Sequence, residues 1–169
     1  MEQSANNKLD LKEKFLSFYN FNKIKIFIFF SLSFIVIIFI SFTQLNQKKN
    51  NSLIAEKYVK AGIYLDSGNK EKSRDILVEI VQSKNSFYSI LALNTIIEKK
   101  LISDKDKIVN YFQIIEKMNI DQETQDLINL KKGLYLIKNN NLQDGENILK
   151  KLIENNSKIK FLAEEILAK

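Results

Sequence analysis

The sequence predicts an all-α protein, in which a single transmembrane helix near the N-terminus precedes an array of paired helices. Three observations lead to this fold class. An apolar run without charged residues covers residues 26–42. The apolar residues that follow recur at helical intervals of three and four positions. The 169 residues include only four Gly and no Pro, whereas all-β folds need many tight turns.

The residue types that are missing exclude several kinds of site. Without Cys the chain cannot build disulfides, zinc–thiolate sites or thiol nucleophiles. Without His it lacks the commonest general base and transition-metal ligand. The four Gly match neither GxxxxGK nor GxGxxG, the loops that bind phosphate. We therefore expect no enzymatic activity, no catalytic or metal-binding residues, no cofactor and no small-molecule substrate.

The positive charge does not indicate a nucleic-acid partner. The formal net charge is +6, but all 26 basic residues except Arg74 are Lys. Lys, Ile and Asn are abundant together, as is typical of AT-rich coding sequences. Proteins that read nucleic acids favour Arg, because its guanidinium makes paired hydrogen bonds to guanine and phosphate. We expect no nucleic-acid partner.

The first predicted element, residues 1–23, is a Lys-bearing arm. Leu11, Phe15, Phe18 and Tyr19 fall on one face of a short helix, a pattern typical of helices that lie in the headgroup layer of a membrane. A partly ordered polar tail fits the same residues. The sequence leaves both interpretations open.

The second element, residues 24–45, is the predicted membrane span. At about 1.5 Å per residue, some 20 apolar residues cross a hydrocarbon core of about 30 Å. A cleaved signal peptide is the alternative, but its apolar core is usually about 7–15 residues long and ends at small residues. Here the apolar run is longer and no Ala-x-Ala-like site follows it. We expect an uncleaved anchor.

The Lys residues around the span predict its orientation. Lys23 and Lys25 stand directly before it, and the arm carries further Lys. The excess over the Lys residues that follow the span is small, and by the positive-inside rule it favours a cytoplasmic N-terminus. We therefore expect a single-pass membrane protein with residues 46–169 outside the cytoplasm, which for a bacterium means the periplasm.

Residues 46–169 predict a tetratricopeptide-like array of helical hairpins, with about three units and a C-terminal capping helix. A shift of 72 residues aligns Leu77 with Leu149 and the apolar positions around them. A middle copy places Phe112 at 35 residues from Leu77, and a period of about 34–37 residues is that of tetratricopeptide-type repeats. The expected helices cover residues 52–66, 70–83, 86–99, 104–118, 121–139, 143–155 and 158–168.

Small residues recur where the two helices of a unit should approach closely. Ala61 and Gly133 stand in first helices, and Ser73 and Gly145 stand in second helices. A large side chain at such a position would push the helix axes apart. In the middle unit Ile108 takes the place of Ser73, so we expect that unit to pack differently.

Turn and cap residues separate the predicted helices. Gly68 and Asn69 provide left-handed backbone between the first two helices of the array. Ser86, Asp104 and Asp121 are expected at the N-termini of later helices, where their side chains can cap free backbone N–H groups.

Two groups of acids could otherwise be read as acid–base or metal sites. Asp104 stands near Asp106, and Asp121 stands near Glu123 and Asp126. Both groups lie at predicted helix starts, where acids complement the helix dipole. We interpret them as structural.

Binding by shape is the activity that remains. In a helical-repeat array the first helices line a concave surface that accepts a segment of a partner protein. Tyr64, Tyr88, Asn94 and Tyr135 are the predicted groove residues, because amphipathic side chains suit a partly exposed contact surface. The alternative is that these Tyr residues pack between helices.

Three short motifs resemble a known family. They are AEKYVKAGIYL at residues 55–65, SGN at 67–69 with the helix of residues 73–81, and FYSILAL at 87–93. Together with the N-terminal span, they resemble the ancillary SecYEG translocon subunit family (YfgM-like). The resemblance implies an inner-membrane protein with a periplasmic helical domain and no catalytic residues. Its implied partners are the translocon, exported chains and periplasmic chaperones.

The function we expect is that of a membrane-anchored protein–protein interaction module near the translocon. It would assist the handover or folding of exported proteins without nucleotide. One alternative is an anchored scaffold for envelope assembly or cell division. Another is a secreted helical repeat protein, if the span is cleaved. An enzyme would have to use the acids near Asp104 or Asp121.

Overall fold

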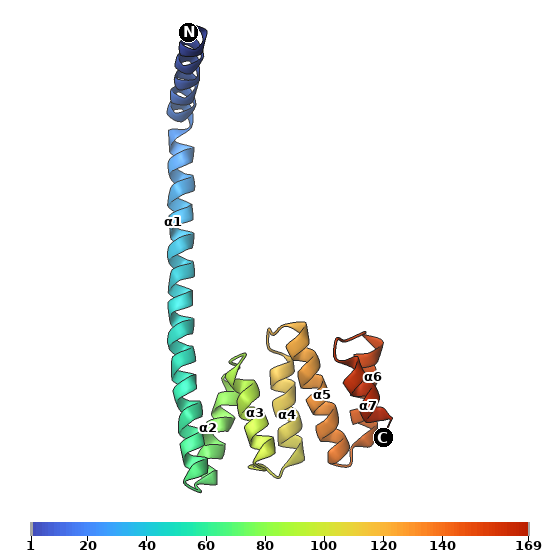
Figure 1. Ribbon diagram of the computed structural model, residues 1–169. Helices are drawn as coiled ribbons and strands as arrows, with labels where there is room; N and C mark the ends of the chain where they lie inside the picture. The colour runs from blue at the N-terminus through green and yellow to red at the C-terminus, as the bar shows by residue number, and fades with distance from the viewer. Residues whose placement is uncertain (1, 169) are drawn as a thin grey trace. The chain divides into compact units, whose positions relative to one another are not determined.

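The computed structural model describes residues 2–168, which form seven helices and no strand (Figure 1). By their contacts the residues divide into two units, Met1–Asn50 and Asn51–Lys169. Helix α1 crosses this boundary. The helices are α1 (Glu2–Asp66), α2 (Lys70–Gln82), α3 (Tyr88–Glu98), α4 (Lys105–Glu116), α5 (Gln122–Lys138), α6 (Leu142–Glu154) and α7 (Lys160–Leu167).

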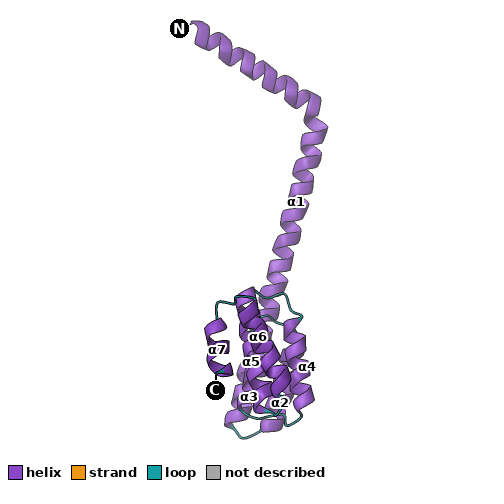
Figure 2. Cartoon of the chain, turned by 90° about the vertical axis from the view of Figure 1, so that its right-hand side faces the viewer, coloured by secondary structure: helices purple, strands orange, loops and turns teal. Residues whose placement is uncertain are grey.

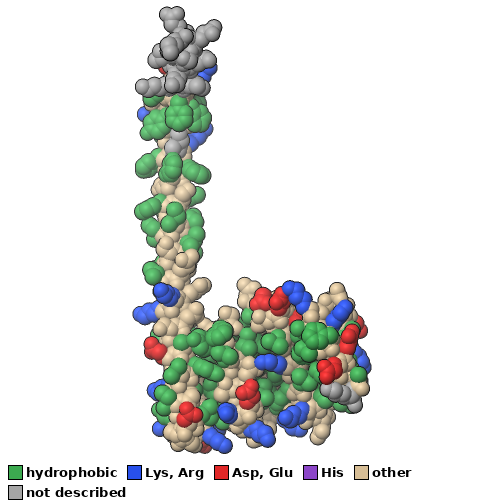
Figure 3. Space-filling view, in the orientation of Figure 1, with side chains coloured by type: hydrophobic (Ala, Val, Ile, Leu, Met, Phe, Trp, Pro, Cys, Tyr) green, Lys and Arg blue, Asp and Glu red, His purple; other side chains and the backbone are tan. Residues whose placement is uncertain are grey.

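The first unit consists of the N-terminal part of α1. An 18-residue window of this helix has a mean hydropathy of 2.3, and none of that window is buried. Phe27, Phe34 and Phe39 are 75%, 63% and 68% exposed, and hydrophobic side chains surround the helix there (Figure 3). The window is therefore not a core helix. By length and composition it can cross a membrane, a criterion that a signal sequence also meets.

The second unit contains the end of α1 and the six other helices. From α2 onwards each helix packs against the next, and α2 also contacts α4 (Figures 1 and 2). The bounds of α2 to α7 lie within two residues of those predicted from apolar periodicity. The first predicted helix of the array, residues 52–66, is the last part of α1. Since the chain between the span and this segment contains neither Gly nor Pro, nothing local ends the helix there.

The 72-residue register also appears in the backbone. Helices α2 and α6 begin and end 72 residues apart. Gly68 and Asn140, which follow α1 and α5, both have left-handed backbone with φ of 80° and 67°. Lys84 and Asn156, which follow α2 and α6, have φ of 56° and 52°. The two three-helix segments α1–α3 and α5–α7 therefore share their turns as well as their apolar pattern.

Most of the predicted caps are found. Asp104 and Asp121 are the N-caps of α4 and α5, and each accepts a hydrogen bond from the backbone three residues on. Two predictions were wrong. Asn69 is not left-handed but has φ of −84° and caps α2. The backbone at the start of α3 is capped by the amide of Asn85, not by Ser86.

Two clusters of buried apolar side chains form the core. The first unites residues of α1 to α5, and the second unites α5, α6 and α7. Helix α5 serves both, because Ile128 belongs to the first cluster and Leu130 to the second. Two positions along a helix turn by about 200°, so these side chains point to opposite sides.

Small residues lie where paired helices meet. A Cβ atom on Gly145 would be 2.7 Å from the carbonyl oxygen of Gly133. Ala61 and Ser73, at the corresponding places in α1 and α2, have no exposed surface. Ile108 of α4 is equally buried, and α3 and α4 share a smaller contact than α5 and α6. The middle unit, where Ile108 stands in place of Gly or Ser, therefore packs less closely than the last unit, as a larger side chain at this position predicts.

Candidate partner-binding cleft

Helices α3, α4 and α5 are neighbours in the second unit (Figure 1). A cleft of about 250 Å³ opens among them. We call it the α3–α5 cleft. Helices α3 and α5 each contribute residues spaced by three or four positions, so that one face of each forms a wall, and α4 contributes Phe112. The lining consists of Asn94, Ile97, Glu98, Phe112, Lys131, Leu134, Tyr135 and Lys138.

The lining of the α3–α5 cleft is mainly apolar. Phe112 of α4 is 1% exposed, and its ring centroid lies 5.9 Å from that of Tyr135 at an interplanar angle of 49°. Leu134 remains 40% exposed. The cleft therefore offers apolar surface to a partner, backed by aromatic rings that the core holds in place.

Polar contacts fix the walls of the cleft. Lys131 Nζ donates a hydrogen bond to Asn94 Oδ1 at 3.0 Å and so joins α5 to α3. Lys132 Nζ lies 2.8 and 3.0 Å from the two carboxylate oxygens of Glu116 and joins α5 to α4. The side chains of Lys132 and Glu116 are only 14% and 23% exposed. A partly buried ion pair that also makes hydrogen bonds restrains the geometry more than an exposed pair does.

The hydroxyl of Tyr135 keeps its proton. Burial, followed by the negative charge of Asp104, raises the pKa of Tyr135 above 10.0. The phenol is therefore neutral over the physiological range. Beside the amide of Asn94, it gives the cleft an uncharged group that can donate or accept a hydrogen bond from a peptide backbone.

The structure brings together two of the four predicted groove residues. Asn94 and Tyr135 both line the α3–α5 cleft. Tyr88 lies outside this lining, where its ring meets Tyr58 at 5.9 Å. Tyr64 also lies outside it, with Lys72 Nζ 5.5 Å from its ring centroid. Tyr88 therefore packs between helices, as the alternative interpretation had it.

Sequence reasoning missed most of the lining. Ile97 and Leu134 were not singled out, and Phe112 was identified only as a repeat position. Their spacing contained a usable signal, because residues 94, 97 and 98 and residues 131, 134, 135 and 138 each follow one helix face. That signal shows which residues share a face, but not that the two faces meet.

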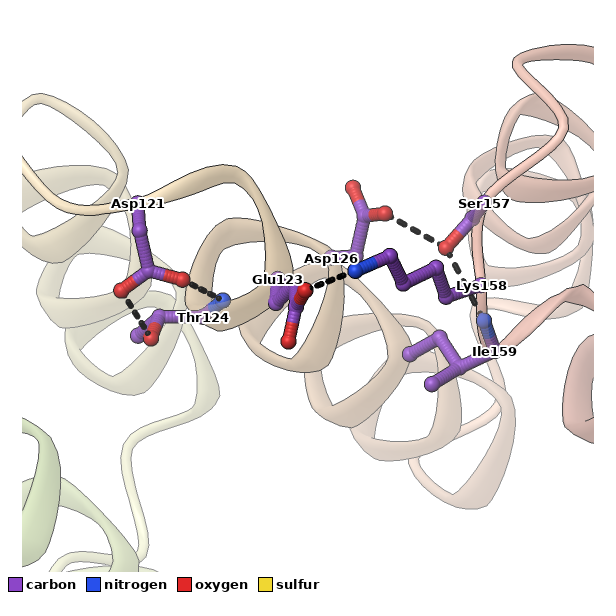
Figure 4. Close-up of polar contacts among 7 residues, drawn as sticks. All are labelled: Asp121, Glu123, Thr124, Asp126, Ser157, Lys158 and Ile159. Carbon is purple, nitrogen blue, oxygen red and sulfur yellow. Dashed lines mark hydrogen bonds and ion pairs between the residues drawn. The ribbon is translucent and has the colours of Figure 1, made fainter.

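The acids at the start of α5 have structural partners (Figure 4). Asp121 accepts hydrogen bonds from the backbone N–H of Thr124 at 2.9 Å and from its hydroxyl at 2.7 Å. The backbone bond, with the hydroxyl bond second, lowers the pKa of Asp121 below 3.8. Among the described residues no group of three or more His, Cys, Asp or Glu side chains could hold a metal ion.

The neighbouring acids hold α5 to the loop between α6 and α7. Glu123 forms an ion pair with Lys158, and Asp126 accepts a hydrogen bond from Ser157 (Figure 4). In the first segment Asn85, the position equivalent to Ser157, donates to Asn51 of α1 at 2.6 Å. A side-chain contact between this loop and the first helix of the segment therefore occurs in both halves of the 72-residue repeat.

The size of the α3–α5 cleft indicates what it can accept. Sites for small molecules usually measure about 300–1,000 Å³, and this cleft is smaller. A volume of 250 Å³ suits one or two apolar side chains of a peptide segment. The exposed Glu98 and Lys138 at its lining are placed to contact polar groups beside them.

Comparisons with protein families, with curated proteins and with solved structures found no match to this chain.

Proposed function

We propose that this chain is a membrane-anchored protein-interaction module that binds segments of partner proteins in the α3–α5 cleft. The observation that carries the proposal is the cleft itself, in which apolar surface, a neutral phenol and an amide lie between two helices. A peptide segment needs such a combination, because its side chains seek apolar contact while its backbone needs hydrogen bonds.

The repeat supports a tetratricopeptide-like arrangement of the second unit. A register of 72 residues corresponds to two repeats of about 36, within the range of that architecture. The α2–α4 contact, which skips one helix, is what a row of stacked hairpins requires. In this arrangement α7 covers the apolar edge of the last hairpin with Leu162 and Ile166, which pack on the second core cluster.

The anchor supplies the functional context in this proposal. The span holds the protein in a bacterial inner membrane, with the N-terminus cytoplasmic and the helical domain periplasmic, as the Lys residues beside the span favour. The resemblance described above implies a position beside the translocon, where the protein would help to hand over or fold exported chains. Confinement to the membrane raises the local concentration, so that even a weak cleft meets emerging chains often.

Two substitutions on one helix test the role of the cleft. Leu134 lies in the cleft and is 40% exposed, whereas Leu127 lies outside the lining and is 41% exposed. In pull-downs of the full chain from native membranes, L134E should lose its partners, because a carboxylate would enter the apolar lining. L127E should keep them. Equal capture by both variants would refute the cleft as the binding site.

A second experiment separates the binding proposal from its location. A reporter fused to the C-terminus, read separately for periplasmic and cytoplasmic activity, should be active only in the periplasm. Cytoplasmic activity would refute the role at the translocon exit. Captured proteins that include neither translocon subunits nor periplasmic chaperones would refute the translocon assignment while leaving the interaction module intact.

A further inference from the structure

We propose that residues 13–25 of α1 form a membrane-surface helix whose aromatic face lies in the anionic headgroup layer. The membrane is the one that the adjacent span crosses, so this inference rests on the proposed anchor. It adds a second contact surface, separate from the cleft, and names its partner as lipid.

The aromatic face is defined by helical spacing. Phe15, Phe18 and Tyr19 lie three and four positions apart and are 75%, 61% and 51% exposed. Phe21, three positions after Phe18 and four after Ser17, lies toward the other side of the helix and is 88% exposed. Aromatic side chains of this size rarely cluster in water on a single helix, whereas the boundary between headgroups and acyl chains accepts both their rings and the Tyr hydroxyl.

The other side of the helix is polar. Asn20 is two positions from Phe18, which turns it by about 200° to the opposite side. Glu13 and Ser17 lie on the same side as Asn20, at helical spacings of three and four. Over residues 13–20 the aromatic face and the polar face are therefore separate, the arrangement of helices that lie in the plane of a membrane surface. Ile24, four positions after Asn20 and next to the span, falls on the same side as Asn20 and is 68% exposed.

Charge favours anionic lipid as the occupant. Lys23 and Lys25 stand between the aromatic face and the span, and both are exposed. Lys side chains can bury their methylene stems while their ammonium groups reach phosphate oxygens. Because the span fixes one end of the segment at the membrane, the headgroup layer is the surface that its aromatic face meets first.

The side-chain amide of Asn22, near the aromatic face, makes one hydrogen bond within the helix. Asn22 Nδ2 donates to the carbonyl oxygen of Phe18 at 3.1 Å, within the same helix. An amide whose donor is used in this way is less costly to bring close to the apolar layer than an unpaired one. Asn22 therefore does not oppose the proposed position of Phe18.

The natural chain contains no Trp, so single Trp substitutions report their surroundings directly. We would place the full-length F18W, N20W and I37W variants in phosphatidylcholine–phosphatidylglycerol vesicles, with and without bromine on the upper acyl chains. F18W should emit at shorter wavelength than N20W and lose about half of its emission to brominated lipid, because such helices bury their apolar face about 5–10 Å deep. N20W should be quenched little.

The same variants give the results that would overturn the inference. An F18W emission like that of N20W, both unquenched, would show that the arm projects into water. A blue-shifted but unquenched F18W would show that protein, such as a second copy, covers the face. In both cases quenching of I37W would show that the anchor itself is intact. An unquenched I37W would overturn the anchor and this inference together. When phosphatidylglycerol is replaced by phosphatidylcholine, we expect F18W to lose its quenching, since the Lys residues bind anionic lipid. Unchanged quenching would refute the role of charge.

Discussion

Alanine substitutions at Gly62 and Gly145 test the packing of the helical domain most directly. Both residues lie within helices and neither has positive φ, so Ala gains up to about 1 kcal/mol of helix propensity at each. Their surroundings differ. A Cβ atom at Gly62 meets nothing within 4 Å, whereas one at Gly145 would be 2.6 Å from Ile137 Cγ1 and 2.7 Å from the Gly133 carbonyl oxygen.

The difference in surroundings sets opposite signs for the two substitutions. A backbone oxygen cannot rotate away, so in G145A the helices α5 and α6 must separate. Overpacking of this kind costs about 1–3 kcal/mol. After the gain in propensity, we expect G145A to lower the free energy of unfolding by up to about 2 kcal/mol and G62A to raise it by up to about 1 kcal/mol.

Urea unfolding of the full chain in detergent micelles, followed by far-UV circular dichroism, measures both effects. With an unchanged slope, a shift of the transition midpoint reports the change in stability. The stability of G133A should fall between those of the other two variants. The nearest atom to its added Cβ, at 2.9 Å, belongs to the flexible end of the Leu149 side chain. If G145A proved as stable as G62A, the close approach of α5 and α6 described above would be refuted.

Two further predictions concern buried hydroxyls and a helix cap. S73A should stabilise the domain by about 1 kcal/mol, because the buried Ser73 hydroxyl has no hydrogen-bond partner among the described residues. S89A should destabilise the domain by a similar amount, since Ser89 Oγ donates to the Ile80 carbonyl oxygen at 2.8 Å. If urea unfolding showed both substitutions changing the stability in the same direction, this reasoning would be contradicted. The pKa of Asp121 is lower in the folded protein than its ordinary value of 3.8. Its carboxylate therefore stabilises the fold above pH 3.8, and this contribution is lost as the pH falls through the folded-state pKa. The Asn side chain of D121N keeps a capping oxygen but does not titrate. The melting temperature of D121N should therefore fall less steeply between about pH 5 and 3 than that of the natural chain. Parallel curves would show that Asp121 contributes nothing to the pH dependence of stability.

The helices could be predicted because their causes are local. Apolar spacing, the Asp104 and Asp121 caps and the left-handed Gly68 all act within a few residues, and each is visible in the sequence. The two errors had the same origin. Asn85 and Ser86 are adjacent residues of similar capping ability. Gly68 and Asn69 are adjacent residues that can both adopt the left-handed backbone of a turn. Backbone geometry chose between them, and sequence preference alone could not.

By itself, the sequence determined the helical class, the bounds of α2 to α7 and the 72-residue register, and it marked the apolar stretch that is able to cross a membrane. These features depend on periodicity and composition along one chain. Only the tertiary structure decided that Asn94 and Tyr135 share a cleft while Tyr64 and Tyr88 do not. Its lining is drawn from three helices, and the Asn94–Lys131 hydrogen bond joins residues 37 positions apart. Such a meeting depends on how the helices pack against one another, and apolar spacing along one helix does not determine which other helix its face meets.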